Sequence, residues 1–367
     1  MRRFAKAFRR LPDPRAANAR HDLLEVLVIA LAATLCGAES CSDMADFGES
    51  KEELLRLFLR LEHGVPSHDT FSRVFRLIEP EAFEKVFRGF MAAFAKANGL
   101  KLSGVVAVDG KALRGAYERG SKATPLHLVN VFAVEARMAL AQCKAPGRNE
   151  TAGALDVLEL LNLKDCIVTA DALHCTRAFA ATVLERGGDY ALVVKANHRP
   201  LFKSATQQFT RSGMRSSTKQ IERSTHDRSE TRSATIMRNT KLAEAHRFPG
   251  IAAIGRVTLR RRMRGKPADK PVVRYYVLSK YMSPKKLLQV TRSHWGIENR
   301  LHWVLDVHFG EDRNRARKDN APENLAILRK LALNVLRTHP HGASIRRKIK
   351  RSGWNNTFLL GMLGQMQ

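Results

Sequence analysis

The sequence predicts an α/β fold with an all-helical N-terminal domain and a β-rich insertion, and three features of the apolar pattern indicate this. The first hundred residues place apolar side chains at helical spacing and show little strand signal. After Gly99, short apolar runs alternate with helical segments, as in a sheet covered by helices. Between residues 215 and 282 this alternation gives way to polar, basic stretches with strand-like runs, and the helical period then returns.

The bulk composition favours a globular protein that binds a polyanion. Of 367 residues, 44% are hydrophobic, which is enough for a sizeable core. Lys and Arg number 63 against 35 Asp and Glu, which gives a net charge of +28. Nucleic acid is the expected partner. A membrane surface is the alternative, but the basic residues are spread along the chain and flank no amphipathic stretch.

Cysteine usage and apolar run lengths argue against a zinc ribbon and a membrane span. The five cysteines include no CxxC pair, and we interpret them as reduced thiols. The most apolar stretch, residues 26–38, is shorter than the roughly 20 residues that cross a bilayer, so it predicts a buried helix. No secretory signal is recognisable, and we expect a cytoplasmic protein associated with the nucleoid.

The N-terminal domain, residues 1–99, is expected to be helical. Turn residues Pro66-Ser67 and Glu79-Pro80 precede its last two helices, a pattern compatible with a DNA-binding helix-turn-helix. A pair of helices that only packs is the alternative. The predicted helices span residues 22–38, 50–61, 68–77 and 80–97.

The strand and helix order after residue 100 predicts the core. Three consecutive strands are followed by helix, strand, helix and strand, and this order matches a ribonuclease H-like layout. The predicted strands are 105–109, 126–135, 138–144, 166–171 and 190–195, with helices at 151–161 and 175–186. The domains expected from this segmentation are a first part of the core (100–214), the insertion (215–282, with strands at 230–237, 251–260 and 271–279), C-terminal core helices (283–340, with helices at 283–309 and 322–337) and a basic tail (341–367).

Two aspartates follow apolar strands of this core. Asp109 ends the run Val-Val-Ala-Val-Asp, and Asp171 ends Cys-Ile-Val-Thr-Ala-Asp. If the strands are neighbours, both carboxylates meet at the carboxyl edge of the sheet. Carboxylates there can hold the two Mg²⁺ ions that phosphodiester cleavage uses. The alternative is that each Asp only caps a helix or forms a turn.

A third acid is expected from the late helical segment. Glu298 has His294 four residues before it and His302 four residues after it, so the three share one helical face. A face with two histidines and a glutamate is too polar for the buried side of an ordinary core helix. A transition-metal site is the alternative, although no HExxH motif is present. Asp306 and Glu311 are rival candidates for the third ligand.

Basic residues beside the aspartates are candidates for DNA contact. Gly110 is expected to turn the backbone sharply after Asp109, and Lys111 and Arg114 could neutralise phosphates. His174, just after Asp171, could touch substrate. The alternatives are a turn with surface bases and a histidine that only caps or packs.

Long motifs around these residues resemble the H-repeat-associated group of insertion-sequence DDE transposases. They are AVDGKALRGA (107–116), VTADALHCT (168–176), GGDYALVVKANH (187–198) and RSHWGIENRLHWVLDVHFGED (292–312). The resemblance implies a ribonuclease H-like core in which Asp109, Asp171 and Glu298 hold two Mg²⁺, with Mn²⁺ able to replace it. It also implies cleavage of double-stranded DNA at transposon ends, strand transfer into target DNA, and a homodimer or larger synaptic oligomer.

The chain departs from one signature of related transposases. Those proteins often place Tyr, Arg and Lys around the Glu, whereas this chain has Thr291, His294 and Leu305 at these positions. Contacts to the terminal strand are therefore expected from other groups near Glu298, namely Arg292, His294, Arg300, His302 and Arg313. Two other functions fit the residues: a catalytically silent DNA-binding descendant of a transposase, and a ribonuclease H-like nuclease without strand transfer.

Overall fold

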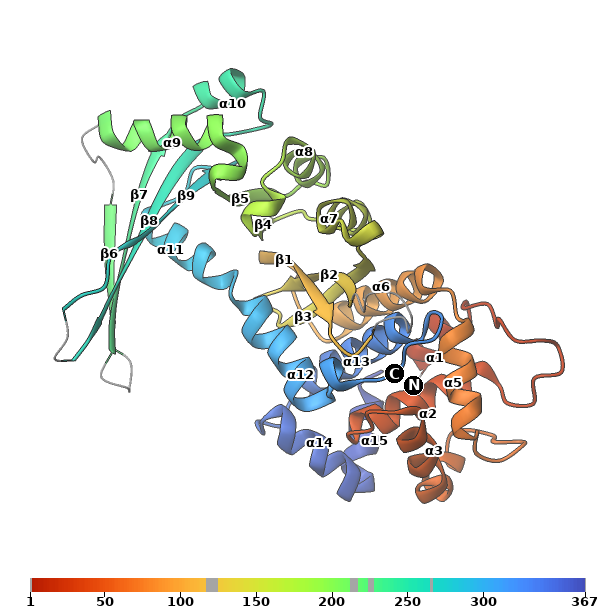
Figure 1. Cartoon of the computed structure of the whole chain (residues 1–367). Helices are drawn as coiled ribbons and strands as arrows, with labels where there is room; N and C mark the ends of the chain where they lie inside the picture. The colour runs from red at the N-terminus through yellow and green to blue at the C-terminus, as the bar shows by residue number, and fades with distance from the viewer. Residues whose placement is uncertain (1, 117–124, 212–216, 224–227, 265–266, 367) are drawn as a thin grey trace.

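A single mixed sheet of nine strands runs through the computed structural model, which describes residues 2–116, 125–211, 217–223, 228–264 and 267–366. The strand order is β3-β2-β1-β4-β5-β9-β8-β7-β6. Helices cover the half that begins with β3, and the other half extends away from the helical body (Figure 1). The strands are β1 (Gly104–Leu113), β2 (Leu126–Ala133), β3 (Met138–Lys144), β4 (Cys166–Ala170), β5 (Asp189–Val194), β6 (Ser217–Arg223), β7 (Arg228–Arg238), β8 (Ala253–Met263) and β9 (Val272–Leu278).

The first five strands form where the apolar runs predicted them. β1, β2 and β3 make an antiparallel meander, and β4 and β5 add to β1 in parallel. The connections into β4 and β5 pass through α7 (Glu150–Glu159) and α8 (Arg177–Glu185), because parallel neighbours need a crossover. Their central residues are fully buried, as expected for strands covered on both faces.

β1 is longer than predicted, and the turn expected at Gly110 is absent. The strand continues past Asp109 to Leu113, and Gly110 pairs with Val129 of β2. Gly110 has no positive φ, but a Cβ there would lie 2.4 Å from a carboxylate oxygen of Glu150. The glycine therefore permits a close approach rather than a turn.

The insertion continues the same sheet. β9 pairs antiparallel with β5, and β8, β7 and β6 follow outward. Three of its strands were predicted, whereas the polar β6 was not. The helix α9 (Arg199–Arg211), which precedes the insertion, was not predicted either. A short helix, α10 (Lys241–His246), precedes β8. The expected boundary at residue 215 lies outside the described residues.

N-terminal and C-terminal helices pack together into one helical body (Figure 1). α2 is buried along almost its whole length and contacts α13, and the backbone N–H of Arg3 donates to the carbonyl of Met366 at 3.1 Å. The basic tail folds as two helices. The helices are α1 (Arg2–Phe8), α2 (Leu23–Leu35), α3 (Cys41–Ser50), α4 (Glu52–Arg56), α5 (His68–Leu77), α6 (Pro80–Ala97), α13 (Ala321–Thr338), α14 (Ile345–Trp354) and α15 (Asn356–Gly364).

The bounds of these helices test the predictions for the first hundred residues. The helix expected at 50–61 is shorter than predicted, because only α4 forms in that range, and α3 before it was not predicted; the helices at 68–77 and 80–97 were confirmed. None of the helices in the described part of the chain combines the length and the apolar composition needed to span a bilayer.

One interrupted helical segment links the insertion to the helical body (Figure 1). α11 (Pro284–Ser293) begins with Ser283 as N-cap and proline in its first turn. A π-helical turn, η4 (Glu298–His302), follows and continues into α12 (Trp303–Phe309). Gly310, at φ +60°, ends α12. This segment carries the acid expected from the late helices.

Candidate functional site

Asp109 and Asp171 occupy equivalent positions on neighbouring parallel strands. In the β1–β4 register Val108 pairs with Ala170, so each aspartate is the next residue after a matched pair. The side chains of both line one cavity of about 390 Å³. The convergence expected from two apolar runs ending in an acid is therefore present, although β1 itself continues beyond Asp109.

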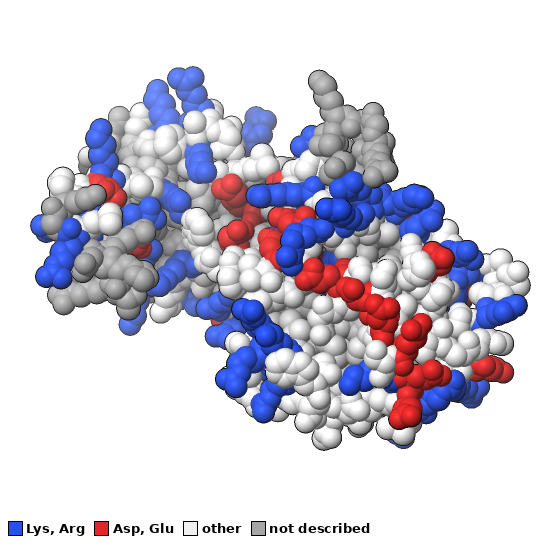
Figure 2. All heavy atoms as spheres, turned by 60° about the horizontal axis from the view of Figure 1, so that its bottom comes forward, with Lys and Arg blue, Asp and Glu red and all other residues white. Residues whose placement is uncertain are grey.

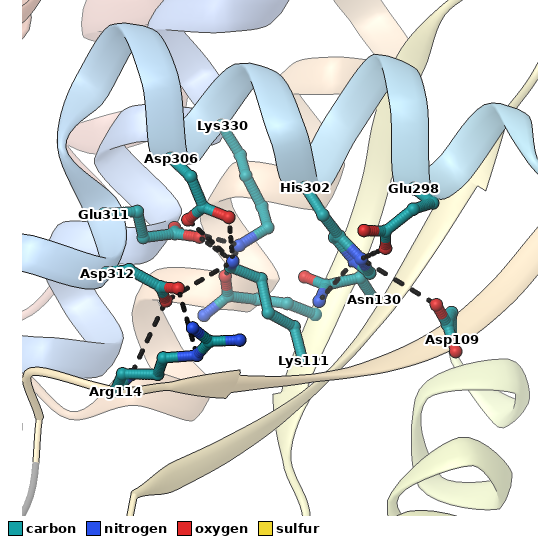
Figure 3. Close-up of polar contacts among 11 residues, drawn as sticks. Asp109, Lys111, Arg114, Asn130, Glu298, His302, Asp306, Glu311, Asp312 and Lys330 are labelled. Atoms are coloured by element: carbon teal, nitrogen blue, oxygen red, sulfur yellow. Dashed lines mark hydrogen bonds and ion pairs between the residues drawn. The ribbon is translucent and has the colours of Figure 1, made fainter.

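Glu298 reaches the same cavity from the π-helical turn. Its carboxylate accepts a hydrogen bond from His302 Nδ1 at 3.2 Å, and the same nitrogen lies 3.8 Å from Asp109 Oδ2. π-turns inside helices are frequent at functional sites, where the wider turn changes the direction of a side chain. Here η4 holds Glu298 and His302, and Figure 3 shows both directed toward the strand that carries Asp109.

A buried asparagine orients the histidine between the two acids. Asn130 lies opposite Asp109 in the β1–β2 register and is fully buried. Its side-chain nitrogen lies 3.3 Å from His302 Nε2, so in this orientation Nε2 accepts and Nδ1 carries the proton that points to Glu298. Asn130 and His302 thus fix the direction of the Glu298 carboxylate.

Asp171 is held by a different set of contacts. Its carboxylate accepts a hydrogen bond from the backbone N–H of Ala172 at 2.6 Å and lies 3.6 Å from Lys195 Nζ. Lys195 directly follows β5 and lines the same cavity. On the opposite wall, His294 Nδ1 lies 3.2 Å from Thr169 Oγ1. The polar row on the late helices thus spans the cavity, with His294 toward β4 and His302 toward β1.

The surroundings of the three acids shift their pKa values in different directions. Burial raises the pKa of Asp109 to about 6, with His302 opposing this rise and Glu298 adding to it. Burial would also raise the pKa of Asp171, but the Ala172 N–H and Lys195 outweigh it, so that pKa is lowered. The hydrogen bond from His302 lowers the pKa of Glu298. Burial lowers the pKa of His294 to about 4, so this ring is neutral at pH 7.

The donor atoms fit a hard divalent cation. Ligand atoms of Asp109, Glu298 and His302 all lie within 4.8 Å of one another. Asp171 stands outside that group but shares its cavity. Carboxylate oxygens are the ligands that Mg²⁺ prefers. Asp109 lacks a full positive neighbour at hydrogen-bond distance among the described residues, and a bound cation would stabilise its charge.

The two rival acids lie in a separate cluster. Asp306 contacts Lys111 at 2.7 Å, and Glu311 is buried between Lys111 and Lys330 (Figure 3). Neither belongs to the group of potential metal ligands around Asp109. Glu298 is therefore the late acid that the fold brings to the aspartates.

The basic residues expected to contact DNA differ in accessibility. Lys111 is buried and ion-paired with Asp306, and His174 is 1% exposed and packs against Phe179. His302 is also buried, beside Glu298. All three side chains are therefore enclosed by the protein. The exposed candidates are Arg114, Arg292, Arg300 and Arg313, of which Arg114 lies near Asp312 and Arg313 pairs with Glu39.

Sequence reasoning missed Lys195 and Asn130. Lys195 ends the apolar run of β5 just as the aspartates follow theirs, so the same edge argument could have found it. Asn130 interrupts the apolar run Leu-Val-Asn-Val-Phe of β2, and a buried amide in a strand needs a partner. Thr169 and Arg274 also line the cavity, and no pattern in the sequence singles them out.

Comparison with known proteins shows that this chain is similar to transposases over most of its length. Residues 101–335 match the family described as "Transposase DDE domain", and residues 5–91 match "DDE_Tnp_1-associated". "Putative transposase YncI" of Escherichia coli O157:H7 is 31% identical over 361 residues, which cover 95% of this chain and 91% of the relative. "H repeat-associated putative transposase YhhI" of Escherichia coli K12 is 28% identical over 363 residues, covering 96% and 95%. The expected resemblance is confirmed.

A solved structure of a piggyBac transposase synaptic complex with hairpin DNA is also similar to this chain. It is 12% identical with a TM-score of 0.43, and the match covers 98% of this chain and 77% of that one.

Proposed function

Because this chain belongs to the DDE transposase family, we propose that it cuts DNA at the ends of an insertion element and joins them to target DNA. The observation that carries the proposal is the single cavity lined by Asp109, Asp171 and Glu298, which come from three distant parts of the chain. The strand order β3-β2-β1-β4-β5 supports a ribonuclease H-like core beneath that cavity.

We assign the three acids as ligands of two Mg²⁺ ions. Bound there, the metals would activate the attacking oxygen and neutralise charge at the attacking and leaving oxygens. Glu298 is directed toward Asp109 by His302, and Lys195 holds Asp171 at the cavity wall. His302 and Asn130 act on the carboxylate rather than on DNA, as groups around metal ligands commonly do.

The distribution of charge supports double-stranded DNA as the substrate. Figure 2 shows Lys and Arg side chains scattered widely over one face, with a narrower band of Asp and Glu crossing it. The exposed arginines around the late helices are the nearest candidates for backbone phosphates, together with the arginines of β8. Phosphate contacts position DNA, and the acids would then select the bond that is cut.

Two element ends must be cut and joined together, and we propose that the active form is a homodimer or larger synaptic complex on DNA. The same substrate would associate the protein with the nucleoid.

The test is cleavage of a supercoiled plasmid that carries the gene with its native genomic flanks, with Mg²⁺ or Mn²⁺. Asp109→Asn, Asp171→Asn and Glu298→Gln should each reduce cleavage by at least about 100-fold, because even partners of metal ligands cost about 10- to 100-fold. DNA affinity should stay near that of the wild type, since phosphate contacts carry most of it.

Asp319→Asn is the matched control. Asp319 pairs with Arg76 at 2.7 Å, neither residue lines the cavity, and the loss of this pair should leave cleavage unchanged. Wild-type cleavage by the three site variants would contradict the assignment. Cutting of plasmids without the flanks would instead favour a nuclease, and binding without cutting would favour a silent DNA-binding descendant.

A further inference from the structure

Next to the acids lies a second charged cluster that the proposed chemistry does not use. It is formed by Lys111 of β1 and by acids of α12 and of the turn that follows (Figure 3). Lys111 Nζ lies 2.7 Å from both carboxylate oxygens of Asp306, 3.5 Å from Asp312 and 4.0 Å from Glu311. The lysine side chain is 8% exposed, so solvent screens these contacts little.

The cluster joins the two elements that carry Asp109 and Glu298. On β1, Asp109 and Lys111 are two residues apart and so lie on the same face of the strand. On the late helices, Glu298, His302 and Asp306 follow one another at four-residue spacing, and Figure 3 shows all three on the side that faces β1. The strand and the helix therefore meet at two points, Asp109 with Glu298 and Lys111 with Asp306.

The acids alone do not hold this arrangement. Two carboxylates near one another repel until a cation lies between them. Before metal binds, His302 is the described side chain that bridges Asp109 and Glu298, and it contacts Asp109 only at 3.8 Å. The bidentate contact of Lys111 with Asp306 is shorter and carries full opposite charges, which makes it the stronger link between β1 and α12.

We propose that the Lys111–Asp306 ion pair is a positioning contact that docks α12 on β1 and so sets Glu298 at the distance from Asp109 that metal binding requires. The inference rests on the proposed function, and it assigns these two residues to alignment of the ligands rather than to contact with DNA or metal.

The surroundings of the pair fix the lysine in place. Gly310 ends α12 and begins the turn that brings Glu311 and Asp312 around Lys111. Glu311 is fully buried, and its oxygens accept no hydrogen bond from any residue that the structure describes. Its charge is balanced by Lys111 and by Lys330 Nζ at 3.8 Å, and Lys330 in turn donates to Gln142 of β3 at 2.7 Å.

Asp306→Asn is the better test variant. Removing Lys111 would leave several buried acids without their counter-charge and could unfold the protein. The introduced asparagine would keep the shape of the side chain, and Lys111 would keep Glu311 and Asp312 as neighbours. The measurement is Mn²⁺ binding to the full chain without DNA, by titration calorimetry, followed by the Mn²⁺ dependence of plasmid cleavage.

We expect Asp306→Asn to weaken Mn²⁺ binding by about 10- to 100-fold and to raise the Mn²⁺ concentration for half-maximal cleavage by a similar factor. Saturating Mn²⁺ should restore most of the cleavage rate, and DNA affinity should not change, because neither the ligands nor the phosphate contacts are removed. Asp319→Asn, which breaks an Asp–Arg contact of the same 2.7 Å length elsewhere, should bind Mn²⁺ like the wild type.

Mn²⁺ affinity equal to that of the wild type in a folded Asp306→Asn protein would overturn the positioning role while leaving the proposed function intact. If that variant does not fold, Asp306→Glu keeps every charge of the cluster but lengthens the link to Lys111 by one methylene, and it should weaken Mn²⁺ binding in the same direction; wild-type affinity there would also overturn the positioning role. A wild-type protein that neither binds Mn²⁺ nor cuts DNA would contradict the proposed function itself.

Discussion

Asp109 and Asp171 are the same residue type at matched strand positions, yet their surroundings move their pKa values in opposite directions. Asp109 is more deeply placed, and burial with a nearby Glu298 raises its pKa to about 6. Asp171 has a backbone N–H and Lys195 beside it, and its pKa is lowered. The charge on Asp109 is therefore costly until a cation approaches, whereas Asp171 is already compensated. Such a pair is typical of functional sites.

His174 gives a prediction about pH at the same scale. This side chain is almost fully buried, and its Nδ1 has no hydrogen-bond partner among the described residues. Burial lowers its pKa below the ordinary 6.5, although Glu150 and Asp171 partly oppose this. The unfolded chain thus takes up a proton at a higher pH than the folded protein. Stability that is present above pH 6.5 is lost as the pH falls.

We therefore expect His174→Gln to lose less stability on acidification than the wild type. Between about pH 7.5 and pH 5.5, the fall in melting temperature should shrink by roughly 2 °C, equivalent to about 1 kcal/mol. The control is His68→Gln, because the His68 side chain is 62% exposed and is not buried by folding. An identical fall in melting temperature for wild type and His174→Gln, measured by differential scanning calorimetry, would exclude this account.

Single residues also show how far the sequence could predict the site. Asp109, Asp171 and Glu298 could be proposed together because strand ends and helical spacing are local patterns, and the structure places all three on one cavity. The burial of Lys111 was not foreseen, since the acids that pair with it lie about two hundred positions away in the chain. A lysine beside a candidate metal ligand looks like a phosphate contact until the fold supplies its partner.

Among the elements, the loop after β1 depends on close packing that only glycine allows. A Cβ on Gly115 would lie 2.3 Å from the backbone oxygen of Asn314 and 2.9 Å from that of Asp312. Both atoms belong to the turn after α12, and backbone cannot move aside as a side chain end can. The packing of this loop therefore helps to place the end of α12.

We expect Gly115→Ala to lower the free energy of unfolding by about 1–3 kcal/mol, as overpacking does. Gly89 in the middle of α6 is the control, because nothing lies within 4 Å of a Cβ there. Gly89→Ala should raise the free energy of unfolding by roughly 0.5–1 kcal/mol through helix propensity. Urea unfolding of both variants checks the two signs, and a Gly115→Ala protein as stable as the wild type would contradict the packing argument.

The elements of the core were more predictable than those of the insertion. Buried parallel strands are continuous apolar runs in the sequence, and such runs predicted β1, β4 and β5. β6 is polar and pairs on one side only with β7, so it lacks that signal. The π-turn at Glu298 could not be predicted either. A single π-turn inside a helix changes the hydrogen-bond spacing over a few residues and leaves no separate pattern of apolar residues in the sequence.

At the scale of the whole molecule, the net charge of +28 favours a polyanionic partner, and the insertion carries part of this positive charge. On β8, side chains alternate between the two faces of the sheet. Arg261 pairs with Glu230 at 3.1 Å, whereas Arg260 and Arg262 on the other face are exposed. β8 belongs to the half of the sheet that extends away from the helical body, so these exposed arginines are accessible to DNA.

We expect the double variant Arg260→Ala with Arg262→Ala to bind DNA with a shallower salt dependence. Each lost phosphate contact should reduce the slope of log affinity against log salt by about 1, so the pair should reduce it by about 2. The measurement is fluorescence anisotropy with duplex DNA in EDTA, where no cleavage occurs. Lys164→Ala with Arg186→Ala removes two exposed charges near the amino end of β4, opposite the acids, and should leave the slope unchanged. Equal slopes for the two double variants would mean that β8 attracts DNA only through net charge, and the insertion would then have no phosphate contacts at these arginines.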